Sequence, residues 1–298
     1  MVAQIIGNYL VERGIITRGQ MLVIHKERQR VRAKLGLIAV AEGYMSSFEV
    51  KDIYDEIAND AGEPTDRAFA EIAKARDYLT ASQIKMLAIK QSDSYLCLAE
   101  ALEKLKIMDI ERFNEILDDF PLTTNEIQLD DLKSNDVNRI IPLFLSPEAK
   151  DYVNAACCAV HFLNQKVDAN ICPLEAKIVD EVAASHGVIQ FAKGEKEYVY
   201  ALVAENEEVA TLATCYMRER YDGINEETLD IVKEIVNKIS SAYATDLSQD
   251  GVLIDLMPPK SYTEMTKIKS SGILCFTLTV KYETFYLLIC MSNVMEIQ

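Results

Sequence analysis

The chain of 298 residues carries 31 basic and 47 acidic side chains, a formal net charge of −16, and 49% of its residues are hydrophobic. That length suits one large domain or two ordinary ones, and the acidic balance disfavours nucleic acid and anionic lipid as general partners. No apolar run reaches the roughly 20 residues of a membrane helix, and the first residues lack the order of a signal peptide. We therefore expect a cytoplasmic protein with no membrane partner.

The cysteines and histidines exclude several classes of site. Seven cysteines occur without any C-x-x-C pair, which predicts reduced thiols packed inside the fold. Three histidines lack metal-ligand spacing, and no G-x-S-x-G, G-x-G-x-x-G or Walker sequence occurs. We expect no metal site, no cofactor-binding site and no histidine-based catalysis. These residues are Cys97, Cys157, Cys158, Cys172, Cys215, Cys275, Cys290, His25, His161 and His186.

A unit of helix, turn and helix recurs four times before residue 120. Each copy has a residue that favours helix N-caps at the start of its second helix, and a Gln or Glu stands three residues later in the first three copies, which completes a capping box. Gly14 and Gly43 are placed to end the preceding helices in the left-handed conformation. We predict an all-helical domain over residues 1–120. The four N-cap positions are Thr17, Ser46, Thr80 and Asp109.

At this spacing the unit resembles the tandem motifs of the cyclic-di-GMP-binding domain at the N-terminus of secretion and pilus ATPases, best over residues 4–57. That family opens each motif with a basic residue before Leu-Gly; the second copy here has Lys34-Leu35-Gly36, whereas the first has Ile5-Ile6-Gly7. The resemblance implies cyclic-di-GMP as a ligand, and the alternative is a helical-repeat scaffold. A basic cluster suits a phosphate, an acidic partner or plain solvent exposure. It comprises Lys26, Arg28, Arg30, Arg32 and Lys34.

The helical pattern stops between residues 118 and 138, where Asp, Asn, Ser and Thr predominate. We predict a linker over residues 121–135 and a second domain over residues 136–298. This second domain starts with a mostly apolar helix over residues 147–163, where Pro147 suits the first turn.

The remaining elements predict an α+β domain. Two short β-rich runs flank a Lys-Gly-Glu-Lys turn, two helices follow, and three further strands end the chain. This order predicts helices packed on an antiparallel sheet of about five strands. The predicted strands are 188–193, 197–203, 252–257, 272–280 and 284–291, and the predicted helices are 207–220 and 226–246.

The helix over residues 226–246 has two distinct faces. One is an apolar stripe that suits packing on the sheet, and the opposite face carries polar residues at steps of four, three and four. We expect these polar side chains to share one exposed ridge. The stripe comprises Leu229, Val232, Val236, Ile239 and Tyr243, and the ridge comprises Asp230, Glu234, Asn237 and Ser241.

The ridge resembles the signature of the CheC and CheX chemotaxis phosphatases. Asp230, three residues, Glu234, two residues and Asn237 match that family, and Pro259 follows after 21 residues, one fewer than the family spacing. The order of elements from 185 to 292 also follows the family layout. A second, degenerate trace lies at Asp151 and Asn154, and we expect a single site.

The resemblance implies a phosphatase that removes phosphate from the aspartyl phosphate of a CheY-type response regulator. Asn237 would hold the attacking water and Glu234 would pair with the receiver's lysine; Asp230 is a weaker candidate, because it also complements the helix dipole. The partner receiver domain would supply Mg²⁺, and the family implies a homodimer. Two alternatives stay open: a solvated helix face, and a non-catalytic module that binds receivers or itself while the helical domain senses a ligand or partner.

Overall fold

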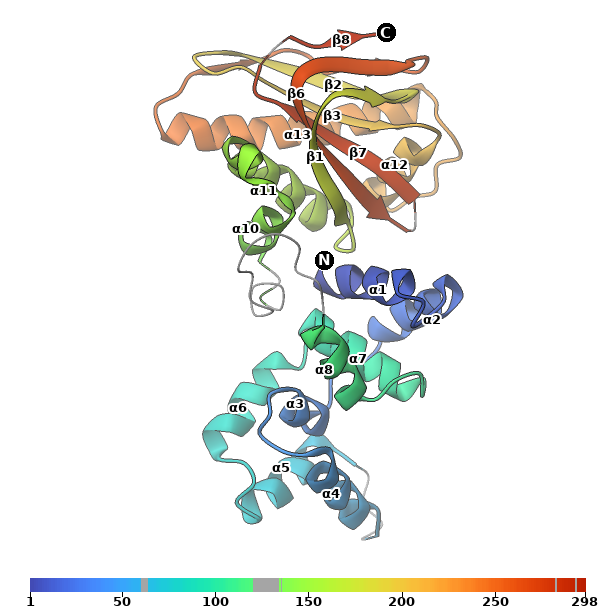
Figure 1. The fold of residues 1–298 in the computed structure, drawn as a ribbon, viewed down its shortest axis with the longest axis vertical. Helices are drawn as coiled ribbons and strands as arrows, with labels where there is room; N and C mark the ends of the chain where they lie inside the picture. Colours follow the sequence, from blue (N-terminus) through green and yellow to red (C-terminus); the bar gives the residue numbers. More distant parts are fainter. Residues whose placement is uncertain (60–63, 120–133, 135, 282, 293) are drawn as a thin grey trace. The chain divides into compact units, whose positions relative to one another are not determined.

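The structure is a computed structural model that describes residues 1–59, 64–119, 134, 136–281, 283–292 and 294–298 (Figure 1). The chain divides into two compact units, one mainly of Ile6–Pro121 and the other mainly of Leu122–Gln298. The linker predicted over 121–135 lies outside the described residues except for Ser134. In the described ranges, no helix combines the length and hydropathy needed to cross a membrane.

Residues 1–59 and 64–119 form eight helices in four consecutive pairs, which confirms the helical prediction (Figure 1). Each pair corresponds to one copy of the repeated unit. The pairs are α1 (Val2–Glu12) with α2 (Arg18–Arg28), α3 (Leu35–Ala41) with α4 (Ser47–Asn59), α5 (Asp66–Ala75) with α6 (Ala81–Lys90), and α7 (Ser94–Lys104) with α8 (Ile110–Asp118).

Local hydrogen bonds start the second helix of each pair. The Thr17 and Thr80 hydroxyls each accept from the backbone amide of the residue three positions later. The side chains of Gln20 and Gln83 accept in turn from the backbone amides of Thr17 and Thr80, so both capping boxes are complete. The Asp109 carboxylate accepts from the Arg112 amide at 2.8 Å. These bonds satisfy amides that a helix start leaves unpaired, and they explain why the repeat was readable from sequence.

The turn inside each pair keeps one left-handed residue even where glycine is absent. Gly14 and Gly43 both have φ of +69°, and the equivalent residues Asp77 and Lys106 have φ of 59° and 54°. A side chain in this region costs roughly 1–2 kcal/mol, because Cβ approaches the following carbonyl oxygen. The last two copies therefore tolerate local strain to preserve the same turn.

Gly36 lies where helices α3 and α4 approach closely, and this contact gives a stability prediction. A Cβ at residue 36 would lie 2.7 Å from Cγ1 of Val50 and 2.9 Å from the ring of Tyr54. We expect Gly36→Ala to lower the free energy of unfolding by about 1 to 3 kcal/mol through overpacking. Gly19→Ala is the matched control, because its Cβ would meet only the Thr17 hydroxyl at 3.9 Å. Equal urea midpoints for the two variants would contradict the prediction.

The second unit contains an antiparallel sheet whose strand order is β1-β6-β7-β3-β2-β4, with β5 paired to β2 and β8 to β6. This confirms the α+β class, with eight strands among the described residues rather than about five. The strands are β1 (Cys172–Ala183), β2 (His186–Gly194), β3 (Tyr198–Ala204), β4 (Ile254–Leu256), β5 (Lys260–Tyr262), β6 (Lys267–Val280), β7 (Glu283–Cys290) and β8 (Glu296–Ile297).

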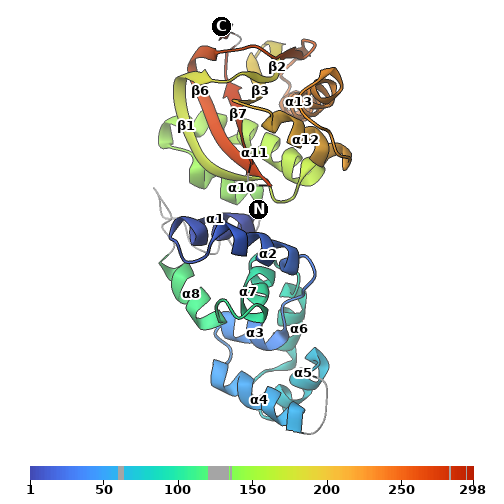
Figure 2. The ribbon, with the colours of Figure 1, turned by 90° about the vertical axis from the view of Figure 1, so that its right-hand side faces the viewer.

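Helices α11 (Val153–Phe162) and α13 (Glu226–Gln249) pack side by side on one face of this sheet (Figures 1 and 2). The buried Tyr198 and Tyr200 of β3 donate to the Ser240 carbonyl of α13 at 2.9 Å and the Ala155 carbonyl of α11 at 2.8 Å. The helical elements of this unit are α10 (Val137–Ile140), η1 (Ile141–Phe144), η2 (Pro147–Tyr152), α11 (Val153–Phe162), η3 (Leu163–Val167), α12 (Glu208–Met217) and α13 (Glu226–Gln249).

Several predicted boundaries were wrong. The helix predicted over 147–163 is a 3-10 segment to Tyr152, an α-helix to Phe162 and then a π-helical turn. The helix predicted over 207–220 ends at Met217, because Arg218 takes a left-handed φ of 59°. Strand β1 was missed, since its exposed charged residues hide the alternation expected of a strand, and only its pairing with β6 completes it.

Candidate functional site

Helix α13 carries the candidate residues on one continuous α-helix. The Asn225 side chain accepts from the Thr228 amide at 3.0 Å, and the Thr228 hydroxyl accepts from the Asn225 amide at 2.8 Å. The predicted apolar stripe is buried throughout. Because this stripe fixes the rotation of the helix on the sheet, Asp230 and Glu234 are turned toward solvent.

The ridge is less uniform than predicted. Asp230 and Glu234 are exposed, whereas Asn237 and Ser241 are only half-exposed. Asn237 is partly covered because β2 and the segment after β4 border the helix at this point. The exposed ridge predicted from the sequence is therefore exposed at Asp230 and Glu234 but only half-exposed at Asn237 and Ser241, and the two candidate residues Glu234 and Asn237 have different surroundings.

Glu234 is exposed to solvent, and one of its carboxylate oxygens accepts a hydrogen bond. Its Oε1 accepts from the Tyr216 hydroxyl of α12 at 3.0 Å. Burial and this bond to Glu234 raise the pKa of Tyr216, so the phenol stays protonated as a donor. Asp230 instead pairs with Lys233 on the same helix at 2.8 Å, an exposed ion pair that contributes little stability. The tyrosine orients Glu234 and leaves Oε2 without a hydrogen bond to any described residue.

Asn237 is hydrogen-bonded to a residue of the sheet. Its Oδ1 accepts from Nε2 of Gln190, in β2, at 2.8 Å, and the same nitrogen donates to the Met257 carbonyl at 2.9 Å. Sequence reasoning missed Gln190. The available signal was a single amide side chain within the otherwise apolar run from Val188 to Ala192.

A cleft of about 740 Å³ adjoins Glu234 between the end of α12 and the start of α13. Four of its lining residues carry carboxylates and none is basic. Two of the others are apolar, Ile231 and Met217, and Met217 is 44% exposed. Such a surface suits a partner with basic and apolar side chains together. The lining residues are Met217, Tyr221, Asn225, Glu226, Glu227, Asp230, Ile231 and Glu234.

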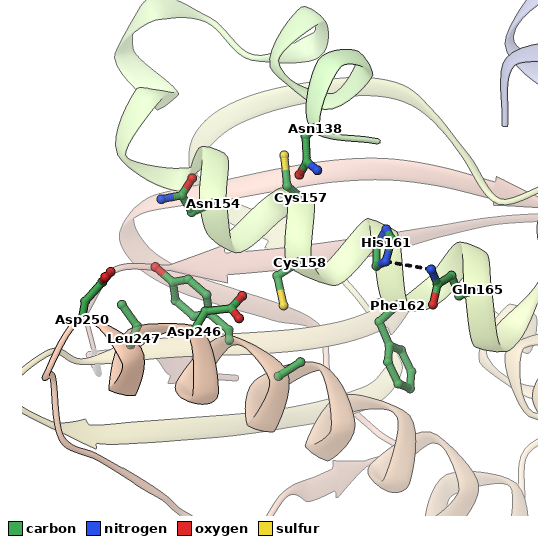
Figure 3. Close-up of a pocket in the computed structure, with 12 residues that line it drawn as sticks. Asn138, Asn154, Cys157, Cys158, His161, Phe162, Gln165, Asp246, Leu247 and Asp250 are labelled. Atoms are coloured by element: carbon green, nitrogen blue, oxygen red, sulfur yellow. Dashed lines mark hydrogen bonds between the residues drawn. The ribbon is translucent and has the colours of Figure 1, made fainter. Parts of the chain in front are cut away.

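The second sequence trace lies at a separate cavity. Asp151 belongs to the 3-10 segment and Asn154 to α11, so no single α-helical turn relates them. Asn154 lines a cavity of about 470 Å³ between α11 and α13, across from Asp246 (Figure 3). Burial raises the pKa of the Cys158 thiol in this cavity to about 12, which keeps it protonated and unreactive.

The cysteines are free and lie buried or half-buried. Burial raises the pKa of Cys157 and Cys290 to about 11 and that of Cys275 to about 12. Within the part of the chain that the structure describes, no three His, Cys, Asp or Glu side chains gather as metal ligands.

Comparison with solved structures finds CheC- and CheX-like proteins. About half of this chain is similar to a CheC-like superfamily protein from Shewanella sp. PV-4, with 16% identity, a TM-score of 0.41, and coverage of 49% of this chain and 98% of that one. The chemotaxis protein CheX from Vibrio vulnificus is 15% identical, with a TM-score of 0.38, and the match covers 48% of this chain and 97% of that one. The chain matched in the CheX–CheY–BeF3–Mg²⁺ complex from Borrelia burgdorferi is 18% identical, with a TM-score of 0.34, and the match covers 49% of this chain and 96% of that one.

No protein-family model matches the sequence, and the search of curated proteins finds no match. The likeness to CheC and CheX structures, which the ridge and the order of elements suggested, is therefore a likeness of fold over about half of the chain.

Proposed function

We propose that this chain hydrolyses the aspartyl phosphate of a CheY-type response regulator in chemotaxis or related two-component signalling. The observation that carries the proposal is the pair on α13: a solvent-facing carboxylate, Glu234, and a carboxamide, Asn237, one helical turn apart and each held by its own hydrogen bond. The spacing of Glu234 and Asn237 matches that of the CheC and CheX signature, and Pro259 follows one residue earlier than in that signature.

Asn237 suits the chemical step. An acyl phosphate is reactive without further activation, so hydrolysis needs mainly a water held in line with the oxygen that leaves. The water attacks phosphorus, the bond from phosphorus to the aspartyl oxygen breaks, and inorganic phosphate and a free carboxylate result. A carboxamide can accept a hydrogen bond from that water while carrying no charge that would repel the phosphoryl group.

Glu234 and the cleft beside it suit docking. The free oxygen of Glu234 is available to a lysine of the receiver, and the neighbouring carboxylates extend the negative surface along α13. Such complementarity raises the rate of encounter and fixes the register of two proteins. In this proposal the receiver brings its own Mg²⁺, and the present chain contributes the amide and the docking surface.

The first test measures the lifetime of a phosphorylated CheY-type regulator from the same organism, with and without catalytic amounts of the full chain. We expect the lifetime to shorten in proportion to the amount of chain added. Identical lifetimes would contradict the proposal. Binding of the phosphorylated regulator without a change in lifetime would instead favour the non-catalytic binding module.

A further inference from the structure

We propose that Gln190 is a positioning residue that fixes the orientation of the Asn237 carboxamide, and that the Met257 carbonyl sets this orientation through Gln190. The inference rests on the proposed function, because it assigns a supporting residue to the same site. It is carried by a chain of two hydrogen bonds between three segments that are distant in sequence.

Gln190 occupies an unusual place in the fold. It belongs to β2, is 1% exposed, and lies on the side of the strand that packs against α13. A primary amide in such a layer is costly unless its polar atoms are paired. Nε2 has two acceptors, but Oε1 is buried and has no hydrogen-bond partner among the described residues. Stability alone would favour an apolar residue here, so an amide at this position points to a role beyond packing.

The direction of the two hydrogen bonds follows from chemistry. A backbone carbonyl only accepts, so Gln190 must turn its nitrogen toward Met257. The same nitrogen lies 2.8 Å from Asn237, so Asn237 must turn its oxygen toward Gln190 and its own nitrogen away. The usual ambiguity between the oxygen and nitrogen of a side-chain amide is thereby resolved by one backbone group.

The Met257 carbonyl is itself held in place. The Met257 amide donates to the Phe191 carbonyl at 2.9 Å, which ties this residue to β2 at the position after Gln190. Pro258 follows directly, and a residue before proline is restricted to extended conformations. The proline segment therefore fixes the carbonyl, the carbonyl orients Gln190, and Gln190 orients Asn237.

This arrangement leaves Asn237 prepared for the step proposed above. One lone pair of Oδ1 accepts from Gln190, so in this proposal the attacking water uses the second lone pair, and the bond from Gln190 opposes rotation of the carboxamide. An amide that is already oriented avoids a reorganisation that would otherwise slow the reaction.

The test uses the full chain with Gln190→Met, which removes both donors at similar length, and Gln190→Glu, which keeps the shape but reverses the preferred direction of the bond to Asn237. We expect kcat for the phosphorylated regulator to fall about 10- to 100-fold while KM changes less than twofold. Gln249→Met is the control, because Gln249 is exposed at the end of α13, and its kcat should stay unchanged.

Two further measurements separate positioning from mere structure. In an Asn237→Ala background, Gln190→Met should cause no additional loss of rate, since its effect acts through that amide. Independently of activity, the side-chain amide signals of Gln190 in the ¹⁵N NMR spectrum, assigned by their loss in Gln190→Met, should show slow hydrogen exchange, because Nε2 donates to Asn237 and to the Met257 carbonyl. Asn237→Ala removes one of these acceptors and should accelerate the exchange.

The outcomes distinguish this inference from the proposed function. If the unaltered chain has no phosphatase activity, the proposed function is wrong, and the amide signals still decide whether Gln190 orients Asn237. If the chain is active and Gln190→Met and Gln190→Glu keep full kcat, or lose the same factor in the Asn237→Ala background, the inference is overturned and the function stands.

Discussion

Replacing Asn237 with alanine is expected to slow dephosphorylation of the cognate regulator by about a hundredfold or more while the regulator still docks. The substitution removes the only group in the proposal that orients the attacking water, and it leaves Glu234 and the cleft unchanged. Single-turnover decay of the phosphorylated regulator reports the rate, and titration with the regulator bound to a phosphate analogue reports docking.

Two variants sharpen this test. Asn237→Asp keeps an acceptor for Gln190 but adds a negative charge beside the phosphoryl group, so it should also be slow. Ser241→Ala, one turn further along the same helix, should retain the full rate. A rate within twofold of the unaltered chain for Asn237→Ala would remove Asn237 from the catalytic step and with it the proposed mechanism.

Replacing Glu234 with alanine is expected to weaken docking of the regulator by about tenfold or more, equivalent to about 1.4 kcal/mol. The carboxylate is the group we propose to pair with the receiver's lysine, and the loss should shrink as salt is raised, because the interaction is electrostatic. Affinity measured at several salt concentrations, by fluorescence anisotropy of a labelled regulator, provides the check.

Neighbouring residues provide the controls for Glu234. Asp230→Ala removes a charge from the same cleft, but Asp230 already pairs with Lys233, so its effect should be smaller. Tyr216→Phe removes the hydrogen bond that orients Glu234 and should weaken docking partially. If Asp230→Ala and Glu234→Ala weaken docking equally, the cleft acts through general charge and Glu234 has no specific role.

The helical repeat shows how far local rules extend. Thr17 and Thr80 make the capping bonds that their spacing predicts, because donor and acceptor lie three residues apart. The left-handed conformation is also found at Asp77 and Lys106, where the sequence has no glycine to predict it. A repeat thus carries information about backbone conformation even where a single copy has lost the residue that favours it.

The sheet shows the opposite case. Strand β1 carries exposed charges and was not predicted. It lies at the edge of the sheet and is stabilised by pairing with β6, whose residues lie about a hundred positions further along the chain. The halves of the candidate site differ in the same way. The relation between Glu234 and Asn237 is a local helical one, whereas Gln190 and Met257 reach Asn237 from separate parts of the chain.

The sequence by itself determined the helical repeat, the α+β order of the second half and the ridge on α13, because these depend on hydrogen bonds and periodicities between residues a few positions apart. Only the tertiary structure decided how each ridge residue is held. Asn237 contacts a strand 47 residues before it, and Gln190 contacts a carbonyl 67 residues after it. Such pairings arise when distant segments pack against a common core, and no local pattern encodes them.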